Sequence, residues 1–388
     1  MHPFYSVPSV AANLETRNLK LETDNMPYRL PAEWEPQEFV LLTWPNETTD
    51  WAPYLQDIRQ TMTEMALAIA RHEKVVILSM YRNDVPDQLR TTENVMVVEL
   101  PNNDTWARDF GPIVLMRTPS AEGNEGLEPT VWLDFRFNGW GEKFLSDWDN
   151  RIPQKLWESL DLVGKAGYEN HRDFVLEGGS IDTDGQGTLF TTSQCLLAPH
   201  RNQPLTQAEI EEQLKCRLRV SRVVWLDHGN LVGDDTDGHI DTIVRCAPEN
   251  TLVYVGCDDT DDEQYEDFLA LENQLKALRT ADGRPYRLLR LPMPEPIYEG
   301  QGTRGKGQEA SAEGQEAERL PATYANFLII NGAVLVPTYA QPEKDAEALR
   351  IVQQAFPDRE MIGIDARTII RQHGSVHCLT MQVPSGEE

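Results

Sequence analysis

The sequence predicts an α/β fold, built from five similar units that surround a common axis. Helical and strand patterns alternate along the chain, which is typical of this class. A short polar segment rich in glycine or aspartate also runs directly into an apolar strand five times. These segments begin at Asn103, Leu176, Gly233, Tyr324 and His373. No fixed sequence period relates these segments, so we interpret them as a recurring structural unit and not as a sequence repeat. Arranged about an axis, the units would bring their polar turns together, and with them Asp109, Glu177, His239 and Cys378.

The individual elements follow from the spacing of apolar residues. A helix is predicted from Asp50, because one face collects Leu55, Ile58, Met62, Met65 and Ile69. The runs "KVVILSM" (74–80) and "NVMVVELP" (94–101) predict buried strands. Two amphipathic helices are predicted further on, over 268–279 and 345–356. Each is followed by a strand, over 287–292 and 361–365.

The domain organisation is predicted to be simple. Residues 1–25 are polar and lack periodicity, so we expect an N-terminal extension followed by a single domain over 26–388. Residues 298–319 are rich in Gly, Glu and Gln and predict a mobile surface loop. This loop is not expected to be a domain boundary, because apolar strands resume at once in "NFLIING".

Composition narrows the class of protein. The chain has 388 residues, with 35 Lys plus Arg against 63 Asp plus Glu, and a net charge of -28. Such a surface repels nucleic acids and anionic membranes and attracts cations. The five cysteines are scattered and form no C-x-x-C pair, which argues against a disulfide framework or a zinc finger. Without a signal-peptide pattern or a long apolar run, we expect a soluble cytoplasmic protein.

The segment "GHID" (238–241) is the first candidate for a catalytic role. If it opens a strand, His239 and Asp241 point to the same face and form a pair suited to proton transfer. A calcium loop is excluded by spacing, because Val244 would stand where the bidentate glutamate belongs. A polar turn before a strand, with no catalytic role, remains an alternative.

Two other segments carry carboxylates. "NDTWARDFGPI" places Asp104, Arg108 and Asp109 around Trp106, an arrangement that suits a planar cation. An ordinary Arg–Asp ion pair explains the same residues equally well. "LEGGSIDTDG" sets Glu177 before glycines, which permit close approach of a ligand and equally permit a tight turn.

Cys378 follows His377 at what reads as the start of a strand. A buried, inert thiol is the commonest fate of a lone cysteine. Metal binding is disfavoured, because His373, His377 and Cys378 would not share one face of a strand. Use as a nucleophile would need a histidine and a carboxylate nearby, which the other polar turns would supply.

Taken in order, these segments resemble the agmatine deiminase family, which is grouped with the Porphyromonas-type peptidylarginine deiminases. The resemblance runs from about Met26 to Pro384 and rests on "WARDFGP", "EGGSIDTDGQGT", "GDDTDGHIDT", "NGAVLVPTY" and the final "HC". It implies a five-bladed α/β propeller (pentein) in a single catalytic domain. It also implies that agmatine is hydrolysed to N-carbamoylputrescine and ammonia in putrescine biosynthesis, through a covalent thiouronium intermediate and without metal or cofactor.

The resemblance further implies roles for single residues. Cys378 matches the nucleophile, His239 the acid/base and Glu177 the carboxylate that holds a substrate nitrogen. Asp109 and Asp241 match the pair that grips the guanidinium, and Trp106 matches a pocket wall. The chain departs from the family at "QHGSV", where a Gly-rich "GGGN" is common, and at Asp182, where many members carry His.

Other functions are compatible with parts of the pattern. Deimination of peptidylarginine, or of another small guanidine, would use the same residues, but secreted peptidylarginine deiminases are expected to carry a signal peptide. A Cys-His protease would place its cysteine near a helix N-terminus and would not need the two aspartates. An acidic, non-catalytic binding protein would leave Cys378 inert. The sequence leaves the oligomeric state open, a homo-oligomer included.

Overall fold

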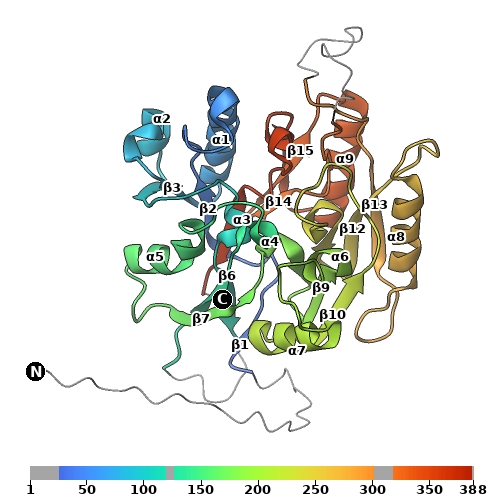
Figure 1. The fold of residues 1–388 in the computed structure, drawn as a ribbon, viewed down its shortest axis with the longest axis horizontal. Coiled ribbons are helices and arrows are strands. Elements are labelled where there is room, and N and C mark those ends of the chain that lie inside the picture. The colour runs from blue at the N-terminus through green and yellow to red at the C-terminus, as the bar shows by residue number, and fades with distance from the viewer. Residues whose placement is uncertain (1–25, 119–125, 301–317, 387–388) are drawn as a thin grey trace, which may run out of the picture.

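The computed structural model describes residues 26–118, 126–300 and 318–386, and within them the strands form five small sheets (Figure 1). With the strands in their order across each sheet, the two four-stranded sheets are β1 (Tyr28–Arg29), β5 (Ile113–Arg117), β6 (Thr130–Arg136) and β7 (Gly167–Val175), and β17 (Thr380–Pro384), β2 (Gln37–Thr43), β3 (Lys74–Ser79) and β4 (Val95–Glu99). Two of the three-stranded sheets are β10 (Arg222–Leu226), β9 (Thr188–Thr192) and β8 (Ile181–Thr183), and β11 (Val244–Ala247), β12 (Thr251–Gly256) and β13 (Arg287–Pro292). The remaining sheet is β14 (Leu328–Ile330), β15 (Ala333–Thr338) and β16 (Glu360–Asp365).

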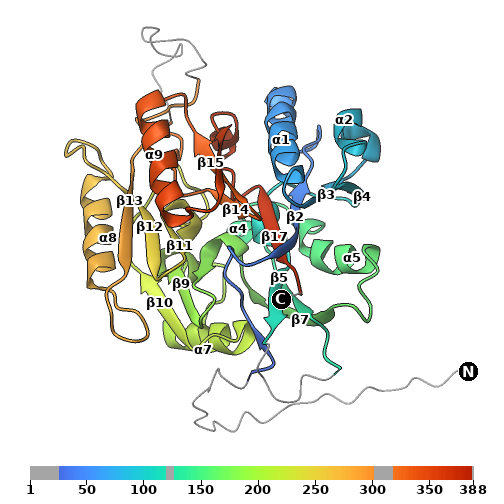
Figure 2. The same cartoon turned by 180° about the vertical axis from the view of Figure 1, so that it is seen from behind.

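The five sheets share one strand arrangement. In each, the strand that follows a polar turn pairs antiparallel with its neighbour, which pairs parallel with the next strand. This holds for β5–β6–β7, β8–β9–β10, β11–β12–β13, β14–β15–β16 and β17–β2–β3. The last sheet joins segments near the two ends of the described chain, with Thr380 opposite Leu42 (Figure 2). The α/β prediction is confirmed, and the five predicted polar segments each lead into a different sheet.

The longer helices lie toward the outside, whereas α3 and α4 lie near the middle of the view (Figure 1). The helices are α1 (Leu55–Ala70), α2 (Asp87–Arg90), α3 (Ala107–Phe110), α4 (Gly139–Glu142), α5 (Ile152–Ser159), α6 (Ser193–Leu196), α7 (Gln207–Leu218), α8 (Tyr265–Ala277) and α9 (Pro342–Ala355). The amphipathic helices bury one face each. In α9 that face consists of Ala348, Ile351, Val352 and Ala355.

Two predictions about elements were wrong in detail. The first helix begins at Leu55 rather than Asp50, because a 3₁₀ turn over Ala52–Tyr54, which contains Pro53, precedes it. The strand predicted over 94–101 is β4, but only Val97 is buried there. It is the edge of its sheet, and an apolar run cannot by itself reveal which strand ends at an edge. The strand predicted over 287–292 is confirmed as β13, and that over 361–365 as part of β16.

The predicted N-terminal extension and the predicted mobile loop lie mostly outside the described residues. This applies to the whole extension 1–25 and to 301–317 of the predicted loop. At the base of that loop, Tyr298 and Arg319 form an antiparallel bridge. In the described part of the chain, none of the helices combines the length and the apolar composition needed to cross a membrane.

Candidate active site

The predicted site residues lie in the turns that lead into the sheets. Asp109 is in α3, ahead of β5, and Glu177 precedes the 3₁₀ turn Gly178–Ser180, ahead of β8. Two predictions need correction here. "GHID" does not open a strand, because His239 caps the 3₁₀ turn Ile240–Thr242 that contains Asp241, and β11 begins only at Val244. Cys378 lies in a turn two residues before β17. The tight turns still aim these side chains at a common centre.

His239 and Glu177 form the first contact of this centre. The two side chains are fully buried, and Nε2 of His239 lies 2.8 Å from Oε2 of Glu177. Arg201 contacts the other carboxylate oxygen, with Nε 2.8 Å from Oε1. Burial alone would raise the pKa of Glu177, but His239 and Arg201 hold it below its ordinary value. Glu177 is therefore an ionised carboxylate at neutral pH, fixed from two sides.

His239 is held as a cation by its surroundings. Burial by itself would lower the pKa of the imidazole, but Asp109, the Cys195 sulfur and the hydrogen bond to Glu177 raise it well above its ordinary value. Its Nδ1 lies 3.7 Å from Oδ1 of Asp109 and has no hydrogen-bond partner in the described residues. One ring nitrogen is thus engaged, and the other is available to a bound molecule.

Asp109 is positioned by two neutral donors. Oδ1 accepts from the backbone N–H of Gly179 at 2.9 Å, and Oδ2 accepts from Nε1 of Trp140 at 2.9 Å. Trp140 adopts a φ of 54°, a conformation that bulky residues rarely adopt and that costs free energy. Burial, together with the charges of Glu177 and Asp241, raises the pKa of Asp109 to about 6 despite the nearby His239.

Only one of the two carboxylate oxygens of Asp241 has a partner in the described residues. Oδ2 lies 2.7 Å from Nδ1 of His377, whereas Oδ1 is buried and has no partner within the described ranges. Gly179 lies between the acidic groups. A Cβ there would stand 2.6 Å from Nδ1 of His239, 2.8 Å from Oδ1 of Asp109 and 3.2 Å from Oδ2 of Asp241. Only glycine leaves this space free, which explains why the turn after Glu177 needs it.

Cys378 lies beside these carboxylates. Its sulfur is 3.7 Å from Oδ2 of Asp241 and receives a hydrogen bond from Nδ2 of Asn326 at 3.2 Å. Burial raises the pKa of the thiol well above its ordinary value, and the charges of Asp241 and Asp109 raise it further. The sulfur is therefore protonated in the free protein. A bound cation would oppose the effect of the two carboxylates and favour the thiolate.

A narrow pocket leads to the sulfur and encloses about 390 Å³, its open mouth included. Aromatic rings of Trp106, Trp140 and Phe144 form walls, and Asp109 and Cys378 lie at the inner end. The lining also includes the exposed carboxylate of Asp50 and the half-buried carboxylates of Asp104 and Asp235. His239, Glu177 and Asp241 lie behind the floor and do not line it. A lining of aromatic rings and carboxylates suits a small cation.

Arg108 does not form the ion pair with Asp109 that the sequence allowed. It turns away from the pocket, and its Nε donates to the His377 carbonyl at 3.4 Å. Its neighbour Trp106 packs against Trp51, with ring centroids 5.6 Å apart, and against Gly374. Of the two interpretations of this segment, the aromatic wall beside a carboxylate therefore matches the geometry.

Three side chains could in principle hold a metal ion. Glu177, Cys195 and His239 each offer a ligand atom, and these atoms lie within 4.8 Å of one another. However, the positive guanidinium of Arg201 contacts both oxygens of Glu177, and His239 is itself protonated. These positive charges disfavour a cation at this place. The donor set fits an acid/base assembly better than a metal site.

Sequence reasoning missed several residues of this centre. Arg201, Cys195 and Trp140 lie outside the polar turns, so no local pattern marks them. Asn326 is different, because it precedes β14 in the fourth polar segment, for which no candidate was named. Its amide also accepts from the backbone N–H groups of His377 and Cys378, at 2.9 and 3.2 Å, and so holds the cysteine turn. The recurrence of five segments could have revealed it.

Comparison with known proteins assigns the class. The profile of the Porphyromonas-type peptidyl-arginine deiminase family matches residues 29–384, and the chain belongs to this family.

Individual relatives are similar over nearly their whole length. Agmatine deiminase from Pseudomonas aeruginosa is 35% identical, over 92% of this chain and 96% of the relative. A crystal structure from Porphyromonas gingivalis, provisionally named an arginine deiminase, is 47% identical with a TM-score of 0.80, covering 92% of this chain and 99% of that one. Campylobacter jejuni agmatine deiminase with substrate bound is 34% identical with a TM-score of 0.81, covering 93% and 97%.

Proposed function

We propose that this chain is an agmatine deiminase, which hydrolyses agmatine to N-carbamoylputrescine and ammonia. The observation that carries the proposal is the convergence of a thiol, an imidazole and three carboxylates at the end of one acidic, aromatic pocket. Relatives named agmatine deiminase support the choice of substrate. Residues 26–388 would form one catalytic domain, with the five sheets as the blades of a pentein propeller.

The planar guanidinium would bind over Gly179, between Asp109 and Asp241. Each carboxylate can accept N–H groups of the cation, and the free Oδ1 of Asp241 offers one such position. A guanidinium carbon is a poor electrophile, because three nitrogens share its charge. Holding it in one plane beside the sulfur offsets part of this disadvantage.

Binding of the cation starts the chemistry. The substrate charge takes the place of the thiol proton as counter-charge to Asp109 and Asp241, so Cys378 releases its proton to solvent, becomes a thiolate and attacks the guanidinium carbon. His239 is protonated beforehand and gives its proton to the departing nitrogen, which leaves as ammonia. A thiouronium remains on Cys378. The neutral His239 then takes a proton from water and the hydroxyl adds to the carbon. The carbon–sulfur bond breaks, the hydroxyl proton passes to the departing sulfur, and the neutral ureido product leaves with the thiol and the imidazolium restored. Glu177 stabilises the imidazole of His239 whenever it carries the extra proton.

The mouth of the pocket favours agmatine over arginine. Asp50, Asp104 and Asp235 would face the far end of the substrate, where agmatine carries an ammonium group. Burial raises the pKa of Asp104 to about 7 and, with the charge of Asp234, that of Asp235 to about 6, and a bound ammonium would keep both ionised. The α-carboxylate of free arginine would meet repulsion at the same place.

Arginine is the second candidate substrate, favoured by the 47% identity to the Porphyromonas gingivalis structure. The experiment is to measure ammonia release from agmatine, free arginine and a blocked arginine peptide. We expect kcat/KM to be highest for agmatine. An equal or higher value for arginine or for the peptide would overturn the substrate assignment, and no release from any of the three would overturn deimination itself.

The acidic binding protein makes a different prediction for the thiol. A non-catalytic protein would show no covalent species on Cys378. Intact-protein mass spectrometry soon after mixing with agmatine should show the thiouronium adduct in the wild type. In His239→Gln the adduct should either fail to form or persist, because the variant has no group to protonate the leaving nitrogen or to deprotonate water.

A further inference from the structure

His377 lies between two carboxylates. It is 2% exposed, its Nδ1 is 2.7 Å from Oδ2 of Asp241, and its Nε2 is 2.9 Å from Oε2 of Glu33. An ionised carboxylate only accepts hydrogen bonds, and a neutral imidazole has only one N–H to donate. Both contacts can therefore be hydrogen bonds only if His377 is an imidazolium or if one carboxyl group keeps its proton.

The surroundings of Glu33 show that it is ionised. Its Oε1 accepts from the backbone N–H of Ile329 at 3.0 Å, and its Oε2 is also ion-paired with Nη2 of Arg245. Burial alone would raise the pKa of Glu33, but Arg245 and His377 hold it well below its ordinary value. Apart from His377, the neighbours of this carboxylate in the described residues are donors, the Ile329 N–H and the positive guanidinium of Arg245, and both favour the ionised form.

The same holds for Asp241. Burial would raise its pKa, but the hydrogen bond from His377, the charge of His377 and that of His239 lower it below its ordinary value, and Arg245 adds to this. Two other groups face Asp241. They are the Cys378 thiol, at 3.7 Å, and the carboxylate of Asp109, whose negative charge repels that of Asp241. His239 and Arg245 favour an ionised Asp241 independently of His377, and with both carboxyl groups ionised the two short contacts of the ring place the proton on His377.

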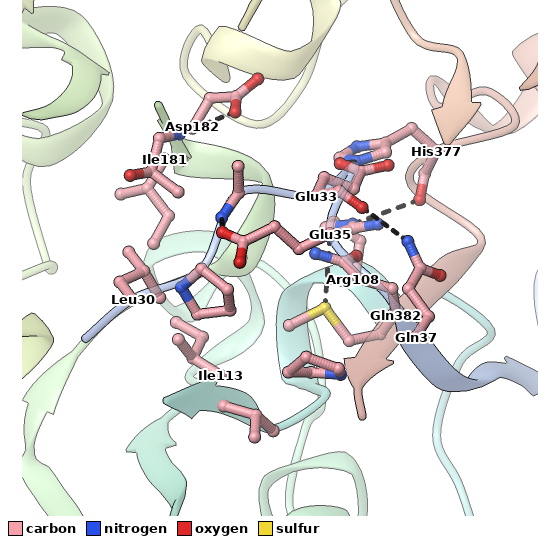
Figure 3. A pocket seen from close by; sticks show the side chains of 17 residues that line it. Leu30, Glu33, Glu35, Gln37, Arg108, Ile113, Ile181, Asp182, His377 and Gln382 are labelled. Atoms are coloured by element: carbon pink, nitrogen blue, oxygen red, sulfur yellow. Dashed lines mark hydrogen bonds and ion pairs between the residues drawn. The ribbon is translucent and has the colours of Figure 1, made fainter. Parts of the chain in front are cut away.

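The buried charges then balance. Arg245 bridges Glu33 and Asp182, with Nε 2.9 Å from Oδ2 of Asp182. Arg108 lies in the same region, next to Glu33 and His377 on one side of a second cavity (Figure 3). Arg108, Arg245 and the His377 imidazolium match the negative charges of Glu33, Asp182 and Asp241. A neutral His377 would leave one buried negative charge without a counter-charge, which is costly.

We propose that His377 is a positioning residue, an imidazolium that orients Asp241 and keeps it ionised for the substrate guanidinium. It engages Oδ2, the oxygen that also lies 3.7 Å from the Cys378 sulfur, and leaves Oδ1 of Asp241 without a partner in the described residues. Glu33 and Arg245 fix the imidazolium from behind. The catalytic half of this inference rests on the proposed deimination, whereas the protonation state of His377 does not.

The first test separates charge from shape. His377→Asn places an amide N–H near the position of Nδ1 and so still reaches Asp241, whereas His377→Gln reaches toward Glu33. Both lose the positive charge. We expect kcat/KM for agmatine to fall about tenfold or more in His377→Asn, the difference between a charged and a neutral hydrogen bond. His377→Gln should lose more, because it no longer orients Asp241.

The pH profile provides a readout that a purely structural role would not change. In the wild type, we expect activity to fall at low pH as Asp109, whose pKa is raised to about 6, is protonated. In His377→Asn the pKa of Asp241 rises, so the decline should begin at higher pH and should depend on two protons instead of one. His228→Asn is the matched control, because the exposed His228 also contacts a carboxylate, that of Asp267 at 3.1 Å, but lies away from the pocket. It should leave kcat/KM and the pH profile unchanged.

The second test is independent of activity. Long-range ¹H–¹⁵N spectra of histidine-labelled wild-type protein should show both ring nitrogens of His377 protonated at about pH 7. The signals are assigned by their loss in His377→Asn or, if that variant does not fold, by their shift in Glu33→Gln. One unprotonated ring nitrogen, an unchanged pH profile in His377→Asn, or equal kinetics of the Asn and Gln variants would overturn the proposal. An inactive wild type would instead refute the deiminase, while the spectrum would still decide the state of His377.

Discussion

Asp109→Asn tests the guanidinium site most directly, because the substitution keeps the shape of the side chain and removes its charge. Both oxygens of Asp109 accept hydrogen bonds, from Gly179 and from Trp140. Asparagine retains one oxygen and directs an NH₂ group at the other donor, so one of the two bonds is lost together with the charge. The side chain is also expected to lose its charge-assisted contact with the substrate.

The magnitude follows from these two losses. Removing one partner from a buried, charged contact costs about 2–5 kcal/mol of binding or transition-state stabilisation. This corresponds to a decrease in kcat/KM for agmatine of about 30-fold to about 5,000-fold. The lost bond should lower the free energy of unfolding by no more than about 3 kcal/mol, because the repulsion of Asp109 by Glu177 and Asp241 is relieved at the same time.

The assay is continuous measurement of ammonia release, with thermal unfolding followed in parallel. Asp134→Asn is the control, since Asp134 is a buried aspartate of β6 that bonds to Tyr168 and does not line the pocket. It should change kcat/KM by no more than about twofold, as for a site away from the chemistry. If folded Asp109→Asn keeps kcat/KM for agmatine within about threefold of the wild type, Asp109 does not bind the guanidinium.

Three further outcomes are expected. Cys378→Ser should abolish ammonia release and leave the thermal unfolding temperature nearly unchanged, because a hydroxyl replaces a buried thiol of similar size; measurable turnover would remove Cys378 from the mechanism. In the wild type, kcat/KM should fall as the pH drops through about 6, because protonated Asp109 cannot bind a cation, and a profile that stays flat to about pH 5 would contradict this. Gly374→Ala should raise KM for agmatine, since its Cβ would lie 2.2 Å from Cζ3 of Trp106 and displace this ring of the pocket wall; an unchanged KM would show that Trp106 does not shape the substrate site.

Much of the fold could be predicted from the sequence, because its signals are local. Apolar spacing identified α1, α8 and α9 and the strands β3, β13 and β16, since a helix or strand needs one continuous apolar face to join the core. The exposed edge strand β4 was interpreted as buried for the same reason. Its apolar residues are a local feature, but its place at the edge of a sheet depends on the rest of the chain.

The candidate site shows the same division. Sequence motifs by themselves determined an α/β protein with five polar turns, and singled out Asp109, Glu177, His239, Asp241 and Cys378. Only the tertiary structure decided which atoms of these residues meet and which partners hold them. The hydrogen bonds from Asn326 to Cys378 and from Trp140 to Asp109, and the placement of His377 between Glu33 and Asp241, join residues that are 31 to 344 positions apart. Such contacts depend on how the five sheets pack around the centre, and the protonation states of the site depend in turn on burial and on neighbouring charges that no short segment contains.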